Sequence, residues 1–213
     1  MTPADAPGAF TGDGPVVGAD GLVRCPWPGD DADYLAYHDH EWGRPVADDR
    51  ALFEKLVLEG FQAGLSWLTI LRKREAFRAA FAGFQPHAVA AFTEADIEAC
   101  CRDRAIVRNR RKIEAAVTNA RALVSLWEQG QALGDLVWAH APAPRDQRPA
   151  SMAELPAATS ESRALAAALR QAGFVFVGPT AGYAFMQAMG LVDDHLAGCH
   201  VPPQACGPRA AAG

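Results

Sequence analysis

Residues 56–67 decide the fold of this chain, and they read LVLEGFQAGLSW. Their first half continues an apolar stripe that recurs at the spacing of a helix. A Gly-Leu break at positions 64 and 65 then separates this helix from a second one that carries Trp67. The stretch therefore predicts two helices joined by a tight turn. The stripe consists of Leu52, Phe53, Leu56 and Val57.

Glu59 projects from the edge of that stripe. A carboxylate in such a place is costly unless something pairs with it, so the ordinary interpretation is a glutamate whose head reaches water or a nearby arginine. Its neighbours favour a recognition site instead. Gln62, Leu65 and Trp67 follow within three turns and supply an amide, an apolar tip and a large ring.

The length of 213 residues allows one compact domain or two closely packed lobes. No apolar run is long enough to span a bilayer. Residues 1–20 are rich in Gly, Ala, Pro and Asp and lack the basic start and apolar block of a secretion signal. We therefore expect a flexible leader over 1–20, a folded domain over 21–205, a flexible tail over 206–213, and a cytoplasmic location.

The remaining pattern is helical and predicts an all-α protein. We expect helices from Asp48 or Asp49 to about Ala63, over 66–81, over 86–92, from about Thr159 to 171, and from Pro179 onward. Residues 174–178 are apolar and are either strand-like or simply buried. Strands and helices do not alternate in the way that signals a parallel sheet.

A net charge of −5 argues against a partner held by broad electrostatic attraction, but the basic residues cluster at 72–74 and 102–112. The second cluster lies where a helix that follows Thr93 meets a long helix that starts at Arg110. Helix-start amides beside Arg and Lys suit a DNA phosphate. An ordinary helical hairpin with a solvated basic end is the alternative, and spacing alone favours it.

Two cysteines and two histidines are candidates for a metal site. His195 and Cys199 stand one helical turn apart, and Cys25 and His38 at the other end of the folded region would complete a Cys2His2 tetrahedron. Four protein ligands leave no open position for water, so such a zinc site would be structural. The alternative is that the cysteines are small buried hydrophobes and the histidines are satisfied polar groups.

Several segments closely resemble the 3-methyladenine DNA glycosylase I family. The resemblance covers nearly everything between Arg24 and about Pro203, in the same order, and the ordered set is far more specific than any single motif. The matching segments are residues 24–27, 34–43, 58–67, 106–113, 174–180, 183–188 and 190–195.

This resemblance implies a helix-hairpin-helix DNA glycosylase fold and removal of 3-methyladenine from alkylated DNA. We expect double-stranded DNA as the partner and a monomeric protein. The resemblance also implies structural Zn²⁺ bound by Cys25, His38, His195 and Cys199. Because a stacked base must be flipped out before its bond to the sugar is cut, the base needs a pocket. The resemblance implies that the base is hydrogen-bonded by Glu59 and Tyr37 and packed by Trp42 and Trp67.

The resemblance makes Leu65, after Gly64, the apolar plug that enters the duplex. At the basic joint, we expect DNA contacts from Arg108, Arg110 and Lys112. Glu59 is the expected catalytic residue, because its charge offsets positive charge in the transition state. Three positions depart from the family pattern: Ala105 for a common Gly, Asp193 for a common Asn, and Phe61 for a polar residue.

Two other functions remain open at this point. One keeps the fold and shifts the substrate to other alkylated purines. The other is a non-catalytic, zinc-stabilised DNA-binding module that has lost the pocket. The joint presence of the four pocket residues argues against the second, since a binding module has no need to keep them all.

Overall fold

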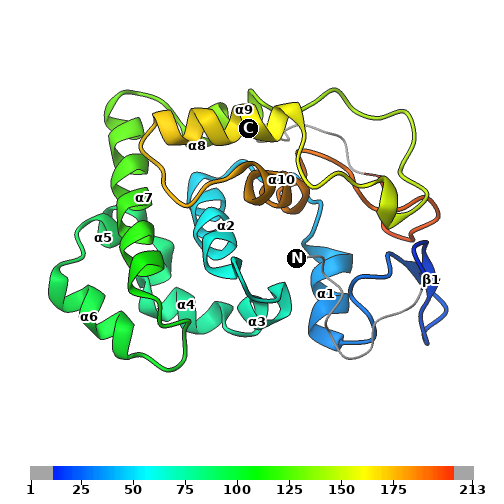
Figure 1. The fold of residues 1–213 in the computed structure, drawn as a ribbon, viewed down its shortest axis with the longest axis horizontal. Coiled ribbons are helices and arrows are strands. Elements are labelled where there is room, and N and C mark those ends of the chain that lie inside the picture. Colours follow the sequence, from blue (N-terminus) through cyan, green and yellow to red (C-terminus); the bar gives the residue numbers. More distant parts are fainter. Residues whose placement is uncertain (1–11, 204–213) are drawn as a thin grey trace, which may run out of the picture. The chain divides into compact units, whose positions relative to one another are not determined.

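The computed structural model describes residues 12–203 and divides into two compact units. The first unit comprises the chain up to Pro45, Ala141–Ala157, and the chain from Met186 onward. The second comprises Val46–His140 and Ala158–Phe185. Helices dominate the described residues, which confirms the expected all-α class (Figure 1). Within the same residues, no helix combines the length and apolar content needed to cross a lipid bilayer.

The first unit contains a small hairpin and helix α1, Ala32–His40. Strands β1 (Val16–Val17) and β2 (Val23–Arg24) pair antiparallel, with Val16 opposite Arg24. The side chain of Asp31 caps α1 by accepting a hydrogen bond from the Tyr34 amide at 3.1 Å. Regular structure thus begins inside the segment assigned to a leader. The rest of that leader, residues 1–11, and the predicted tail, 206–213, lie outside the described residues.

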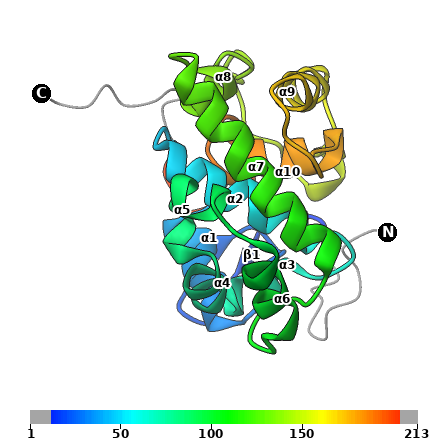
Figure 2. The same cartoon turned by 90° about the vertical axis from the view of Figure 1, so that its left-hand side faces the viewer.

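The second unit is a helical assembly in which the long helix α7 packs against α2, α5 and α6 (Figure 2). A 3-10 turn follows α4 at Ala82–Phe84, and helix α10 (Pro179–Ala188) begins in this unit and ends in the first. Its other helices are α2 Asp49–Gln62, α3 Trp67–Arg72, α4 Arg74–Ala80, α5 Pro86–Ala90, α6 Glu94–Arg102, α7 Arg110–Glu128, α8 Leu133–Trp138 and α9 Ser160–Gln171.

Helix α2 matches its prediction closely. Asp48 caps its start by accepting a hydrogen bond from the Ala51 amide at 2.8 Å. The predicted apolar stripe is buried, and every member is at most 4 % exposed. The stripe anchors α2 in the core of the unit and so fixes the position of the residues at the carboxyl end of the helix.

The single helix predicted over residues 66–81 is wrong, because the chain breaks into α3 and α4 at Lys73. Lys73 adopts φ −96° and ψ 0°, and its amide donates to the carbonyl of Ile70. Its ammonium also donates to the carbonyl of Ala105 at 2.8 Å. Any residue can adopt this conformation, so the break needs no glycine or proline that would have predicted it from the sequence.

The basic joint between α6 and α7 forms as predicted. Thr93 and Asp96 make a reciprocal capping box at the start of α6, and Asn109 caps α7 by accepting from the Lys112 amide at 3.3 Å. In the link between the helices, the Ala105 amide donates to the Asp103 carboxylate at 2.8 Å. Ala105 is not among the residues with positive φ, so this link does not need the glycine that is common there.

Residues 174–178 form an irregular segment, and the strand-like alternative is wrong within the described residues. Phe174 is buried, whereas Val175 and Phe176 are exposed. The buried side chain of Asn119 on α7 holds this segment: its carbonyl oxygen accepts from the Val175 amide at 2.7 Å, and its amide donates to the Val175 carbonyl at 3.2 Å. One side chain therefore replaces the partner that a strand would provide.

Replacing Asn119 with alanine is expected to lower the free energy of unfolding by about 1–3 kcal/mol, because it leaves two backbone groups of Val175 without their partner. Urea denaturation measures this change. Thr118→Ala is the matched control, since Thr118 is exposed and donates only within its own helix, to the Glu114 carbonyl. Equal effects of the two substitutions would contradict the role given to Asn119.

Candidate functional site

Glu59 is buried near the carboxyl end of α2, with 7 % of its surface exposed. One carboxylate oxygen, Oε1, lies 2.9 Å from the ammonium nitrogen of Lys55. Lys55 precedes it by one helical turn and is equally buried, at 6 %. This partner was not predicted from the sequence, although a lysine four residues before a glutamate on one helix is a recognisable signal for a pair.

The ammonium of Lys55 also lies over the ring of Trp67, 3.3 Å from the ring centroid. Trp67 starts α3 and is 8 % exposed. A cation over an indole face is attracted by the ring quadrupole, most strongly where water is absent. Carboxylate, ammonium and ring therefore form one buried group, which we call the Lys55–Glu59–Trp67 group.

The turn between α2 and α3 presents Leu65. Gly64 adopts φ +85°, a conformation that glycine reaches without strain. The Leu65 amide then donates to the Gln62 carbonyl at 2.6 Å, and Ser66 caps α3 by accepting from the Thr69 amide. As a result the Leu65 side chain is 42 % exposed. The structure confirms the exposed apolar tip.

The basic joint has internal contacts that the sequence did not reveal. The ammonium of Lys112 donates to the carbonyls of Phe61 and Ala63, at 2.9 and 2.7 Å, and thereby ties α7 to the end of α2. Burial lowers the pKa of Lys112. No local sequence pattern predicts this long-range contact.

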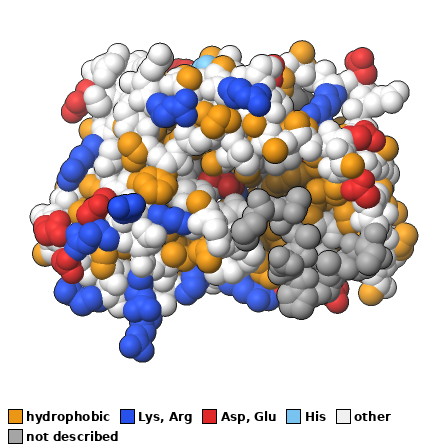
Figure 3. All heavy atoms as spheres, viewed as in Figure 1, with side chains coloured by type: hydrophobic (Ala, Val, Ile, Leu, Met, Phe, Trp, Pro, Cys, Tyr) orange, Lys and Arg blue, Asp and Glu red, His pale blue; other side chains and the backbone are white. Residues whose placement is uncertain are grey.

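Two arginines of the joint differ in their surroundings. Arg110 forms ion pairs with Glu94, Glu98 and Glu114, whereas Arg108 is exposed. Basic side chains lie over the lower left of the molecule in Figure 3, where Figure 1 shows α4, α6 and the start of α7. Contact with DNA stays a prediction for all three basic residues of the joint.

A hollow of about 660 Å³ opens beside the end of α2. The charged residue that lines this hollow is Arg170, whose guanidinium group donates to the carbonyl of Val177 at 3.0 Å. The hollow has no carboxylate, and Glu59 and Trp67 do not line it. It therefore lacks the chemistry expected for recognising a cationic base. Its lining consists of Ala63, Arg170, Phe174, Val175, Phe176, Val177, Gly178 and Ala181.

Tyr37 and Trp42 lie in the first unit, buried to 5 and 9 % exposure. The ring of Trp27 meets both edge-on, with centroids 6.3 Å from Tyr37 and 5.1 Å from Trp42. Trp42 also meets the ring of His195 edge-on, with centroids 4.7 Å apart. Each unit thus contains two of the four predicted pocket residues: Tyr37 and Trp42 in the first unit, and Glu59 and Trp67 in the second.

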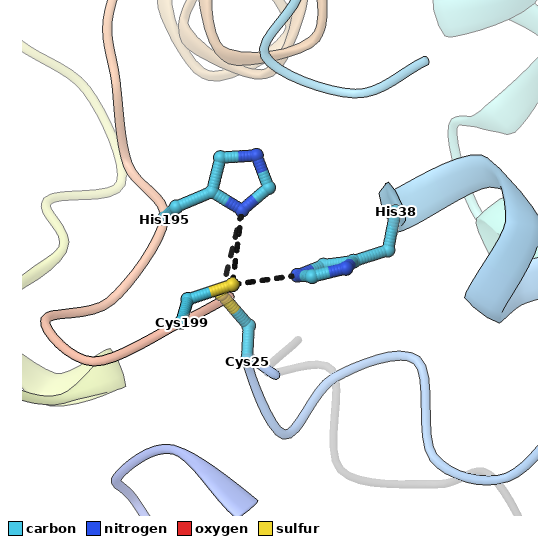
Figure 4. A group of neighbouring side chains, drawn as sticks. All are labelled: Cys25, His38, His195 and Cys199. Carbon is cyan, nitrogen blue, oxygen red and sulfur yellow. Dashed lines mark hydrogen bonds between the residues drawn. The ribbon is translucent and has the colours of Figure 1, made fainter. Parts of the chain in front are cut away.

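Cys25, His38, His195 and Cys199 converge in the first unit, as the sequence predicted (Figure 4). All four are buried, and their candidate ligand atoms lie within 4.8 Å of one another. The Cys199 sulfur is 3.6 Å from Nε2 of His38 and 3.7 Å from Nδ1 of His195. A tetrahedral zinc ion spaces its sulfur and nitrogen ligands by roughly 3.5 Å, so this cluster fits a metal ion.

Neighbouring groups hold the outer nitrogen of each histidine. Nδ1 of His38 lies 2.8 Å from the carboxylate of Asp39, and Nε2 of His195 lies 3.3 Å from the carbonyl of Trp42. The remaining nitrogens therefore face the thiols, which is the usual arrangement around metal-binding histidines. The hydrogen bond between the two thiols raises the pKa of Cys25, together with burial, and lowers that of Cys199.

Asp39 has several hydrogen-bond partners of its own and was not predicted from the sequence to be part of this site. Arg24 donates to both of its oxygens, and His200 lies 2.9 Å from one of them. Burial alone would raise the pKa of Asp39, but these partners hold it below the usual range. Because Asp39 follows His38 directly in the sequence, a carboxylate beside a candidate ligand was the available signal.

Comparison with known proteins places these features in a family. The methyladenine glycosylase family matches residues 27–202. A DNA-3-methyladenine glycosylase of Haemophilus influenzae is 48 % identical over 180 residues, which cover 83 % of this chain and 96 % of that protein.

Solved structures agree with this match. A crystal structure of 3-methyladenine DNA glycosylase I is 48 % identical and has a TM-score of 0.82. The match covers 84 % of this chain and 100 % of the other. The Staphylococcus aureus 3-methyladenine DNA glycosylase I, solved to explain recognition of 3-methyladenine, is 36 % identical with a TM-score of 0.81. That comparison covers 85 % of this chain and 97 % of the other.

Proposed function

The chain belongs to the methyladenine glycosylase family, and from this premise we propose that Glu59 is the group with which it recognises its substrate. The protein is a monofunctional DNA-3-methyladenine glycosylase, which removes 3-methyladenine from alkylated DNA in base excision repair. The observation that carries the role of Glu59 is its burial beside the ammonium of Lys55, which itself lies over the indole ring of Trp67.

The chemistry of the lesion explains why a carboxylate suits this site. Adenine methylated at N3 and still attached to the sugar is a cation, and therefore a good leaving group that needs no strong general acid. When its bond to the sugar breaks, the bonding electron pair stays with the base. The base leaves as a neutral molecule and positive charge develops on the sugar. A water molecule forms the new C–O bond there and releases a proton to the solvent. A fixed carboxylate favours the cationic base and offsets the charge of the transition state.

The other pocket residues take their roles from the family resemblance of residues 34–43 and 58–67. Glu59 accepts a hydrogen bond from the exocyclic amine of the base. The hydroxyl group of Tyr37 also hydrogen-bonds the base, while the rings of Trp42 and Trp67 pack against it. Glu59 and Trp67 are both buried within the second unit, which supports a recognition group from which water is excluded.

Leu65 is the proposed plug that fills the space vacated by the flipped base. For Leu65→Ala we expect kcat/KM on a duplex with one 3-methyladenine to fall about tenfold, because the smaller side chain no longer supports the unstacked step. Affinity for free 3-methyladenine should stay unchanged, since a free base needs no flipping.

Leu22→Ala is the matched control for this substitution, because Leu22 is 40 % exposed on the hairpin of the first unit and Leu65 is 42 % exposed. Single-turnover release assays compare the two variants on the same duplex. Equal losses for both, or loss of free-base binding by Leu65→Ala, would rule out the plug.

The DNA backbone contacts are part of the same proposal. Helix α6, the link at 103–109 and helix α7 form a helix-hairpin-helix, with the amides at the start of α7 directed to a phosphate. Exposed Arg108 is the best placed of the basic residues for a second contact. Arg110 and Lys112 complete the set, together with the turn at Gly64. Double-stranded DNA as partner, action as a monomer, and the cytoplasmic location stay predictions.

Zinc is the metal that we propose for the Cys2His2 cluster of the first unit. Two thiolates and two imidazoles in tetrahedral spacing suit Zn²⁺, and four protein ligands make the site structural, with no place for a reacting water. The ion would join the segment around Cys25 and His38 to the segment around His195 and Cys199, far apart in the sequence.

Chromatography of the bases released from methylated duplex DNA separates the competing functions. Free 3-methyladenine as the main product supports the proposal. Comparable release of methylated guanines would shift the substrate to alkylated purines in general. Absence of any released base at all salt concentrations, from a preparation that still binds DNA, would favour the non-catalytic module.

A further inference from the structure

The second unit holds a buried cation at the proposed site of base recognition. The ammonium of Lys55 is 2.9 Å from the carboxylate of Glu59 and 3.3 Å from the centroid of Trp67. Burying a lysine is costly unless its charge is compensated, and here a carboxylate and the face of a ring compensate it together. Lys55 and Glu59 are both at most 7 % exposed, so little water reaches the pair.

These contacts are the ones that a cationic purine requires. The proposed base must place positive charge beside Glu59 and a flat face against Trp67. Lys55 already supplies the charge beside Glu59 and covers the face of Trp67. Two positive charges a few ångströms apart in a buried site repel each other strongly, so the base and the ammonium cannot share this place.

We propose that Lys55 is a resident cation that occupies the place of the flipped base in the free protein. Entry of the base then moves the ammonium of Lys55 off the ring of Trp67. The four-carbon stem of lysine permits this movement without a change in α2. This inference rests on the proposed function, because it assigns the base to the Lys55–Glu59–Trp67 group.

Displacement of Lys55 by the base affects both the binding of the base and the release of the product. Before the base arrives, the contact with the ammonium fixes the position of the Glu59 carboxylate, at the cost of some affinity for the base. After the bond to the sugar breaks, the released base is neutral and competes poorly for the carboxylate. Return of Lys55 then favours departure of the product. The ammonium of Lys55 is already paired with a carboxylate, so we assign it no Schiff-base chemistry.

Trace acetylation of the full chain tests the movement directly. The probe is 3,9-dimethyladeninium, a purine cation with a methyl group where the sugar would be attached. The chain has three lysines, and Lys73 and Lys112, which donate to backbone carbonyls elsewhere, serve as internal references. Mass spectrometry measures the acetylation rate of each lysine with and without saturating probe.

The expected result is the reverse of ordinary protection by a ligand. Acetylation of Lys55 should rise at least about fivefold when the cation binds, because a shielded amine becomes exposed, while both reference lysines change less than about twofold. Calorimetry on the same sample establishes that the probe binds. Saturable binding with Lys55 still protected would overturn this inference and leave the proposed function intact. Absence of saturable binding would contradict both the displacement of Lys55 and the proposed recognition of the base by Glu59.

The variant Lys55→Met gives a second, independent result. It should bind 3,9-dimethyladeninium about tenfold more tightly than the wild type, since no resident cation has to be displaced. Lys73→Met, which changes a lysine outside the group, should bind as the wild type does. Equal or weaker binding by Lys55→Met, in a sample shown by circular dichroism to be folded, would contradict the exchange.

Discussion

Glu59→Gln is expected to lower kcat/KM for release of 3-methyladenine from duplex DNA by a factor of about 10²–10³, the usual effect of removing one group that stabilises transition-state charge. Glutamine keeps the size of the side chain and removes its charge, so the loss reports on electrostatics more than on packing. Single-turnover release from a duplex with one lesion isolates the chemical step from departure of the product.

Glu54→Gln provides the control on the same helix. Glu54 pairs with Arg78, and its side chain is 16 % exposed. This substitution also removes a carboxylate from α2, but away from the Lys55–Glu59–Trp67 group. We expect its activity to stay within about twofold of the wild type, since partly exposed pairs contribute little. Similar activity of the two variants would mean that Glu59 has no special role.

Cys199→Ser is expected to abolish metal binding and to lower the free energy of unfolding by several kcal/mol. The reason is that a structural zinc ion contributes its binding energy to folding, on the order of 10 kcal/mol in small zinc-binding peptides. A serine hydroxyl is a much poorer zinc ligand than a thiolate. Elemental analysis of the purified protein and urea denaturation measure the two effects.

Cys100→Ser tests whether the effect belongs to the cluster. Cys100 is also buried, at 5 % exposure, but its sulfur lies 3.8 Å from the Ala80 carbonyl in the other unit. This variant should keep its zinc. Unchanged zinc content and stability in Cys199→Ser would refute the metal site, and equal zinc loss in both variants would point to general unfolding.

The sequence predicted the features that depend on local pattern. Apolar residues at helical spacing located α2, and the capping residues Asp48 and Thr93 marked the starts of α2 and α6. The spacing of His195 and Cys199, with Cys25 and His38 at the far end of the folded region, was enough to nominate the Cys2His2 cluster. These predictions succeeded because each depends on a short-range rule or on a restricted choice of ligand chemistry.

Features set by the conformation of one residue or by distant partners were not predicted. The break at Lys73 follows from a backbone conformation that any residue can adopt. The contacts of Lys112 with the end of α2, and of Asn119 with Val175, join residues more than 45 positions apart. Lys55 is a different case, because its spacing to Glu59 was visible but its position over Trp67 requires the turn at Gly64.

We propose above all that the charge of Glu59 selects a positively charged purine. Calorimetric titration with 3,9-dimethyladeninium and with 3-methyladenine, in mildly alkaline buffer where the second is neutral, tests it most directly. The wild type should bind the cation at least about tenfold more tightly than the neutral base, as expected for a carboxylate and a ring that face one positive charge. Glu59→Gln should lose that preference, and a variant that keeps it would contradict the claim.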